Sequence, residues 1–205
     1  GHNIILERSP FTYWPRKPPV VASVQNNIIP EDEELETASN FNEQFYYEEV
    51  LKYYTPKDCI LIANSYCKLG CQYFEKEEYH KAKEFHLKAL KVREELYRGK
   101  KHPHIAISLN NLGQSCFMLG EIDEAFTYHT KALKIRESVF GQEHFATADS
   151  LNNLGMIYLK WFDYSQANSK VSQALDIRQR KYPYNHEKNA IYNNNLAIIY
   201  SAWGS

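Results

Sequence analysis

The chain has 205 residues, of which 43% are hydrophobic, and it carries 24 Lys and Arg against 25 Asp and Glu. This balance argues against a nucleic-acid footprint, and no apolar run approaches the length of about 18 residues that a membrane span needs. No N-terminal stretch joins basic to apolar residues as a secretory signal does. We therefore expect a protein that binds neither nucleic acid nor membrane.

The first 57 residues differ from the rest of the chain. They hold 5 Lys and Arg against 9 Asp and Glu, whereas the remainder holds 19 against 16. Prolines recur up to Pro30, and proline favours extended conformations, so residues 1–30 are predicted to form an extended segment. Apolar positions such as Leu35 and Phe45 predict a capping helix over residues 31–57. The extended segment either lies across the surface, occupies a binding groove of the same chain, or links to a further domain.

A short sequence recurs along the remainder of the chain. It appears as Leu109-Asn110-Asn111-Leu112-Gly113, then 42 residues later as Leu151-Asn152-Asn153-Leu154-Gly155, and again as Asn193-Asn194-Asn195-Leu196-Ala197. An arginine recurs with nearly the same period, at Arg93, Arg136 and Arg178. A fixed period of this length indicates stacked supersecondary units. The predicted units are about 58–99, 102–141 and 144–183, with a half unit at 186–205.

Each full unit is predicted to contain two helices. In the second unit, apolar residues recur at steps of three and four from Ile105 to Leu112, which is the spacing of one helix face. Gly120 ends this helix, and small residues at Ala125 and Ala132 allow the next helix to approach it closely. No stretch of the units alternates with a period of two, so no strand is expected.

These residues resemble the tetratricopeptide repeat (TPR) family, whose signature is a Leu-Gly pair, an aromatic three residues later, and small residues 12 and 19 after the glycine. The first unit matches at Leu69, Gly70, Tyr73, Ala82 and Ala89. The 42-residue period, with His-Pro before the first helix, is most similar to the repeats of kinesin light chains. The resemblance implies an all-α fold, a right-handed superhelical solenoid of antiparallel helix pairs, over residues 58–205.

The resemblance also implies a peptide-binding surface. In TPR arrays the first helix of each unit lines a concave face, and positions beside the Leu-Gly glycine point into it. Carried over to this sequence, with neighbouring positions included, the predicted peptide-binding residues are Lys68, Asn110, Asn111, Gln114, Asn152, Asn153, Met156, Lys160, Asn194 and Asn195. In the first unit two of the corresponding positions hold Cys67 and Cys71.

The asparagines have two interpretations. A side-chain amide offers two donors and an acceptor, so it can pair with the N–H and C=O of an extended peptide without demanding a sequence. Alternatively, the amides bond to adjacent helices and fix the packing of the units, because asparagine is a poor helix residue. Lys68 and Lys160 are the cations at the predicted surface, and two cations do not predict a clamp for a terminal carboxylate.

Other reactive side chains are interpreted as structural. A histidine opens each of three successive units: His102, His144 and His186. Packed helices lie about 8–10 Å apart, so these histidines cannot share one zinc ion. The spacing of Cys67 and Cys71 matches no zinc-finger pattern, although His80 and His86 follow on the next predicted helix. No catalytic residue, metal ligand or cofactor is predicted.

We therefore expect a non-catalytic protein–protein interaction scaffold or adaptor that binds a partner peptide in the concave TPR groove. The alternative is a regulatory or targeting module of a larger enzyme, with the N-terminal segment occupying the groove in an autoinhibitory way. Four cysteines without framework spacing suit free thiols in a cytoplasmic protein.

The last predicted helix, from about His186 to Trp203, carries apolar residues around much of its circumference. Gly204 corresponds to Gly120, the turn between two paired helices, so a covering helix does not follow in this sequence. We expect the chain to be a fragment of a longer repeat protein, or to form a weak homo-oligomer through this C-terminal helix.

Overall fold

The computed structural model describes residues 55–181 and 189–204. These ranges fold into helices with no strand. In chain order the helices are α3 (Pro56–Glu75), α4 (Tyr79–Tyr97), α5 (Pro103–Leu119), α6 (Ile122–Phe140), α7 (Phe145–Lys160), α8 (Tyr164–Lys181) and α9 (Ala190–Trp203). The predicted extended segment, nearly all of the predicted capping helix, and His186 lie outside the described residues.

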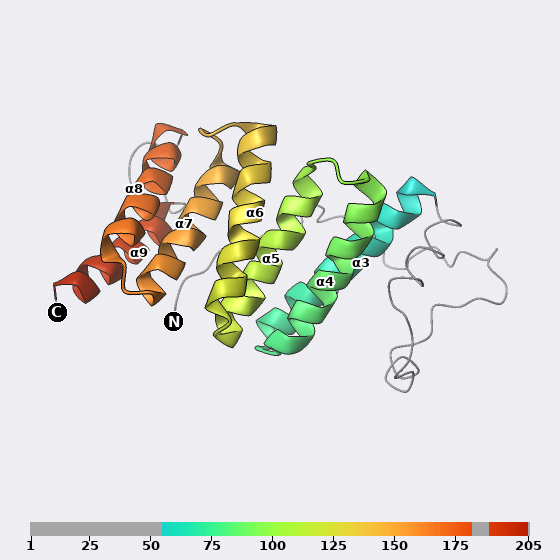
Figure 1. Ribbon diagram of the computed structural model, residues 1–205, viewed down its shortest axis with the longest axis horizontal. Helices are drawn as coiled ribbons and strands as arrows, with labels where there is room; N and C mark the ends of the chain where they lie inside the picture. Colours follow the sequence, from blue (N-terminus) through green and yellow to red (C-terminus); the bar gives the residue numbers. More distant parts are fainter. Residues whose placement is uncertain (1–54, 182–188, 205) are drawn as a thin grey trace.

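The helices stack in chain order (Figure 1). Each packs against the helix before it and the helix after it, and in addition α3 meets α5 and α7 meets α9. We call α3, α5, α7 and α9 the first helices, and α4, α6 and α8 the second helices. This arrangement confirms the predicted all-α solenoid of helix pairs.

Side-chain caps set where several helices begin. Thr55 and Asp58 form a reciprocal capping box, so α3 begins at Pro56, two residues before the predicted first unit. His102 Nδ1 accepts a hydrogen bond from the backbone N–H of His104 at 3.2 Å, and His144 Nδ1 accepts one from Ala146 at 3.1 Å. These contacts satisfy backbone donors that a helix start leaves unpaired. The prediction that His102 and His144 are helix-start residues is therefore confirmed.

The turn inside each helix pair uses one left-handed residue. Gly120 has φ +81°, and the repeat-equivalent positions are Glu77, with φ +64°, and Phe162, with φ +60°. Glycine adopts this conformation at no steric cost, whereas other L-residues are strained by about 1–2 kcal/mol. The turn geometry is thus maintained in all three pairs although the residue type is not.

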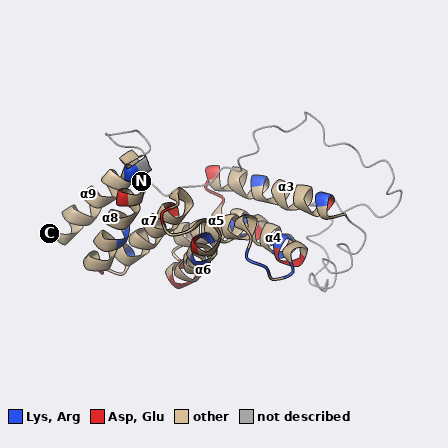
Figure 2. Cartoon of the chain, turned by 90° about the horizontal axis from the view of Figure 1, so that it is seen from above, with Lys and Arg blue, Asp and Glu red and all other residues tan. Residues whose placement is uncertain are grey.

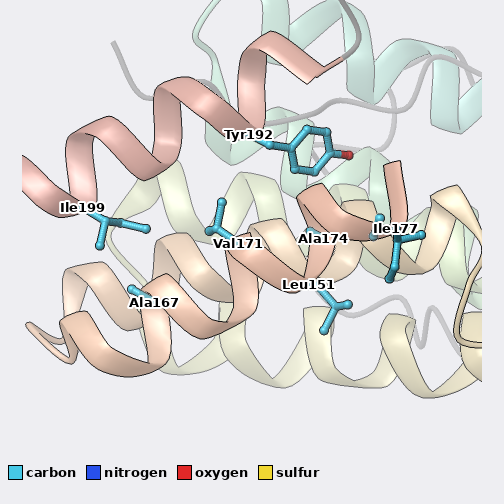
Figure 3. Packing of buried hydrophobic residues seen from close by; sticks show 8 residues of the cluster. Leu151, Ala167, Val171, Ala174, Ile177, Tyr192 and Ile199 are labelled. Carbon is cyan, nitrogen blue, oxygen red and sulfur yellow. The ribbon is translucent and has the colours of Figure 1, made fainter. Parts of the chain in front are cut away.

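Small residues let paired helices approach closely. Ala125, Ala132, Ala167 and Ala174 are fully buried. A Cβ atom added at Gly113 on α5 would lie 2.7 Å from Nε2 of His129 on α6, so only glycine fits there. Figure 3 shows buried hydrophobic residues near the C-terminal end of the stack, where Tyr192 and Ile199 of α9 face the α8 side chains. The buried hydrophobic residues of the described helices form four clusters along the stack.

Charged residues are unevenly distributed along the array. Figure 2 shows Lys and Arg together with Asp and Glu scattered over part of the stack, whereas α5 and α9 contain no Lys, Arg, Asp or Glu. In those helices no segment is both long enough and apolar enough to cross a bilayer.

Candidate functional site

Asparagine side chains join successive first helices. Asn153 Nδ2 on α7 donates to Asn110 Oδ1 on α5 at 3.0 Å, and Asn195 Nδ2 on α9 donates to Asn152 Oδ1 on α7 at 2.9 Å. In both pairs the second asparagine of one Asn-Asn sequence donates to the first asparagine of the preceding sequence. We call Asn110, Asn111, Asn152, Asn153 and Asn195 the asparagine ladder.

Between α3 and α5, cysteine sulfur atoms take the place of the asparagine oxygen that accepts the hydrogen bond. Asn111 Nδ2 on α5 lies 3.5 Å from Cys67 Sγ and 3.8 Å from Cys71 Sγ on α3. Cys67 occupies the repeat position of Asn110 and Asn152. The ladder therefore continues through α3, with thiols as weak acceptors.

Half of each amide remains without a hydrogen-bond partner among the described residues. In the α5 sequence these atoms are Asn110 Nδ2 and Asn111 Oδ1, and in the α7 sequence they are Asn152 Nδ2 and Asn153 Oδ1. All four residues are buried. Each of these two repeats thus holds one unpaired donor and one unpaired acceptor on consecutive residues, and one residue of a peptide backbone also presents one donor and one acceptor.

The structure divides the predicted binding residues by exposure. Lys68, Lys160 and Asn194 are exposed. The buried members are Asn110, Asn111, Gln114, Asn152, Asn153, Met156 and Asn195. Lys160 Nζ lies 5.7 Å from the centre of the Phe117 ring, so this cation rests on an aromatic face. The inter-helix bonds of the ladder match the packing interpretation of the asparagines, and the ligand role stays a prediction.

Buried arginines link each second helix to the following first helix, which sequence reasoning missed. Arg93 Nη1 donates to Ser108 Oγ at 2.6 Å and to the backbone oxygen of His104 at 3.0 Å. Arg136 Nη1 makes the equivalent bonds to Ser150 Oγ at 2.8 Å and to the backbone oxygen of Ala146 at 3.0 Å. The periodic arginines were visible in the sequence, and Ser108 and Ser150 also recur at 42 residues, directly before the Leu-Asn-Asn-Leu-Gly sequence, but the period does not show which of these side chains meet.

The third arginine has a carboxylate partner. Arg178 Nη2 lies 2.6 Å from Asp149 Oδ1, and Arg178 Nε donates to the Tyr192 hydroxyl at 3.0 Å. The Tyr192 hydroxyl in turn donates to Asp149. Burial, followed by the Asp149 carboxylate, raises the pKa of Tyr192, so its hydroxyl stays protonated and remains a donor. This group holds α7, α8 and α9 together.

A lysine lies against one cluster of residues whose side chains are of metal-ligand type and offsets part of its negative charge. Cys116, Glu121 and Glu124 lie close enough together to hold an ion. Lys83 Nζ, however, lies 2.5 Å from Glu121 Oε2 and 2.9 Å from Glu124 Oε2. Burial raises the pKa of Cys116 to about 12, so its thiol is protonated at neutral pH. The lysine supplies the positive charge that the carboxylates need.

Comparison with known proteins identifies the family to which this repeat pattern corresponds. The tetratricopeptide repeat family model matches residues 61–138 and 105–180, which together span more than half of the chain. No curated protein is significantly similar to the chain.

Several solved structures share the fold. BtubC (BKLC) from P. vanneervenii is 27% identical, with a TM-score of 0.63, over 78% of this chain and 62% of that one. This chain therefore spans less than two thirds of that protein. A kinesin light chain-like protein with nearly identical TPR-like repeats from Podosopora anserina is 21% identical, with a TM-score of 0.61, over 68% of this chain and 66% of that one. The first TPR of Spaghetti (RPAP3), bound to an HSP90 peptide, is 16% identical, with a TM-score of 0.53, over 71% of this chain and 96% of that one.

Proposed function

The chain belongs to the tetratricopeptide repeat family, and on this premise we propose that it is a non-catalytic scaffold or adaptor that binds an extended segment of a partner protein along its first helices. The observation that carries the proposal is the asparagine ladder with its half-used amides. An unpaired buried polar atom costs free energy, so a ligand that supplies the missing partner is favoured.

The spacing of the array supports an extended ligand. Packed helices lie about 8–10 Å apart, which corresponds to about three residues of extended chain. About one peptide unit in three would therefore lie beside each repeat, and it would reach the unpaired donor and acceptor only after the side chains that bury them move aside. Backbone pairing of this kind gives affinity without sequence preference, and exposed side chains beside the ladder, such as Lys68, Lys160 and Asn194, would supply selectivity.

A peptide library displayed against the whole chain tests the proposal. Selected peptides are measured by fluorescence anisotropy on the chain and on single variants. Lys68→Ala, Lys160→Ala and Asn194→Ala change exposed residues of the first helices and should weaken binding about 5- to 50-fold, the range expected for one polar contact. The matched control is Lys134→Ala, an exposed lysine of second helix α6, which should leave binding unchanged.

The opposite pattern would contradict the proposal. If selected peptides bind all first-helix variants normally and lose affinity in the α6 control, the ligand lies on the second helices. Failure to select any peptide that binds the folded chain would also count against it.

A regulatory role of the N-terminal segment is the second candidate, and the division of charge favours it. The first 57 residues carry an excess of four negative charges, and the rest carries an excess of three positive charges. Opposite net charges favour association, more so at low salt. The negative excess lies after residue 30, because residues 1–30 hold 3 Lys and Arg against Glu7 alone. Deleting residues 1–54, which keeps the Thr55 cap of α3, should raise the affinity of selected peptides if this segment competes for the first helices, and unchanged affinity would remove the candidate.

A further inference from the structure

Two cysteines lie on one face of α3. Cys67 and Cys71 are four residues apart, so successive turns of the helix place them one above the other. Cys67 is buried and Cys71 is half-buried, and neither is in a disulfide. Asn111 Nδ2 lies within 4 Å of both sulfur atoms. One amide donor of α5 therefore faces the pair.

A buried imidazole lies against the same face. A Cβ atom added at Gly70 would lie 2.5 Å from Cε1 and 2.6 Å from Nδ1 of His86, so the ring lies against α3 at Gly70, which follows Cys67 by three residues and directly precedes Cys71. His86 is fully buried, and neither of its ring nitrogens has a hydrogen-bond partner in good geometry among the described residues. A neutral imidazole carries one N–H, and a thiolate beside it would supply the missing acceptor.

The pair is specific to the first repeat. The positions equivalent to Cys67 and Cys71 hold Asn110 and Gln114 in the second repeat, and Asn152 and Met156 in the third. Asparagine at the Cys67 position maintains the ladder in the other repeats, so the ladder itself does not require sulfur there. The ladder therefore does not explain why the first repeat has cysteine at these two positions.

We propose that Cys67 and Cys71 form a two-thiolate binding site for a soft monovalent metal ion of the Cu(I) class. Binding replaces two S–H protons with two S–Cu bonds and releases both protons, without any change of oxidation state. Thiolates select soft ions. A structural zinc site takes four ligands, and two sulfurs leave such a site half empty.

The surroundings offset the negative charge of a bis-thiolate complex. The Asn111 amide is placed to donate to both sulfur atoms, as outer-shell groups do at metal sites, and the His86 ring lies against α3 at Gly70, next to Cys71 in the sequence. Arg93 bonds to Asn64 Oδ1 at 2.9 Å, and Asn64 lies about one turn before Cys67 on α3. The pKa of Cys67 is lowered, first by the Cys71 thiol, and the Arg93 charge adds to this effect.

Competition for Cu(I) tests the site. The reduced whole chain is titrated under anaerobic conditions with Cu(I) against the chromogenic chelator bicinchoninate. We expect one Cu(I) per chain, and a loss of affinity of more than about 100-fold in Cys71→Ser, because removing even an outer-shell partner costs about 10–100-fold. His86→Val should cost about 10–100-fold. Valine occupies the equivalent position against Gly155 in the third repeat, so the helix packing tolerates it.

Matched controls separate the pair from other thiols. Cys59→Ala and Cys116→Ala remove the two remaining cysteines and should leave Cu(I) binding unchanged. Circular dichroism checks that each variant is folded, and if Cys67→Ala unfolds, the half-buried Cys71 decides the result. Equal Cu(I) affinity of Cys71→Ser and the unmodified chain would overturn the proposal. Loss of binding in Cys116→Ala alone would overturn it too, because the ion would then lie beside Glu121 and Glu124.

Discussion

At the scale of single residues, the asparagine ladder couples stability to the proposed binding surface. Asn153→Ala removes the donor to Asn110 Oδ1 and leaves that buried oxygen without a partner. Such a loss costs about 1–3 kcal/mol. We expect the free energy of unfolding to fall by this amount in urea denaturation.

Asn194 provides the matched control for this substitution. It holds the same repeat position as Asn110 and Asn152 but is exposed on α9. Asn194→Ala should therefore change the free energy of unfolding by less than about 0.5 kcal/mol. If Asn153→Ala proves equally harmless, the ladder does not stabilise the stack.

The Arg178–Asp149 pair is the second test at this scale. The side chains are 13% and 7% exposed, so Asp149→Ala leaves a largely buried guanidinium without its carboxylate. Breaking a buried pair in this way costs about 3–5 kcal/mol. Glu143 bonds to Arg180 at a similar distance of 2.9 Å, but both side chains are more than half exposed. Glu143→Ala should cost no more than about 1 kcal/mol in the same denaturation experiment. Equal costs for the two substitutions would contradict the assignment of Asp149 as a structural partner.

At the scale of helices, the sequence predicts the helix pairs of each repeat, but it says much less about the side-chain contacts between successive repeats. The 42-residue period, Gly120 and the capping histidines predict where helices begin and end because these signals act on the local backbone. The sequence could not show which half of each asparagine amide is used, because that depends on how one repeat stacks on the next. The same limit hid the bonds from Arg93 and Arg136 to Ser108 and Ser150, because a shared 42-residue period does not show which periodic side chains meet.

The α7–α8 turn allows a prediction at this scale. Phe162 adopts a left-handed conformation, and its side chain is 75% exposed, so little burial offsets the strain. Phe162→Gly should raise the free energy of unfolding by about 1 kcal/mol, measured by thermal and urea denaturation. Phe162→Ala removes the same ring but keeps a Cβ atom, so it should give no such gain. A gain of equal size in both variants would show that the aromatic ring, rather than the backbone, is responsible.

At the scale of the whole molecule, buried histidines make stability depend on pH. Burial, with a smaller contribution from Arg136, lowers the pKa of His129 to about 3, and burial lowers that of His104 to about 4. Between these values and about 6.5 the unfolded chain binds protons that the folded chain does not. Stability should therefore be complete above pH 6.5 and fall as the pH decreases, by about 2 kcal/mol for His129 between pH 7 and pH 5.

Val171 suggests the control for this prediction. It occupies the position of His129 in the third helix pair, against Gly155 in place of Gly113. His129→Val should therefore preserve the packing and reduce the loss of stability between pH 7 and pH 5. Urea denaturation at the two pH values measures both, and an unchanged difference in the variant would assign the pH dependence to other groups.

Aromatic side chains gather on the surface where α9 meets the α7–α8 turn. Phe162 and Tyr164 have ring centres 6.5 Å apart, and Tyr164 stacks on Trp203 at 6.5 Å. Trp203 is 50% exposed and the nearby α9 residue Tyr200 is 55% exposed. Contiguous apolar surface of this kind favours association. We therefore expect weak self-association through this surface, visible as a sedimentation coefficient that rises with protein concentration.

Polar substitutions should distinguish self-association through this aromatic surface from association through other exposed apolar residues. Trp203→Gln together with Tyr200→Gln removes the α9 part of the aromatic surface and should abolish the rise in sedimentation coefficient. Leu61→Gln is the control, because Leu61 is 41% exposed on α3 at the opposite end of the described stack. Burial of Trp203 in the associated form should also reduce quenching of tryptophan fluorescence by iodide as concentration increases. A monomer at all concentrations would remove the aromatic surface as a self-contact, and suppression by Leu61→Gln as well would locate association elsewhere on the array.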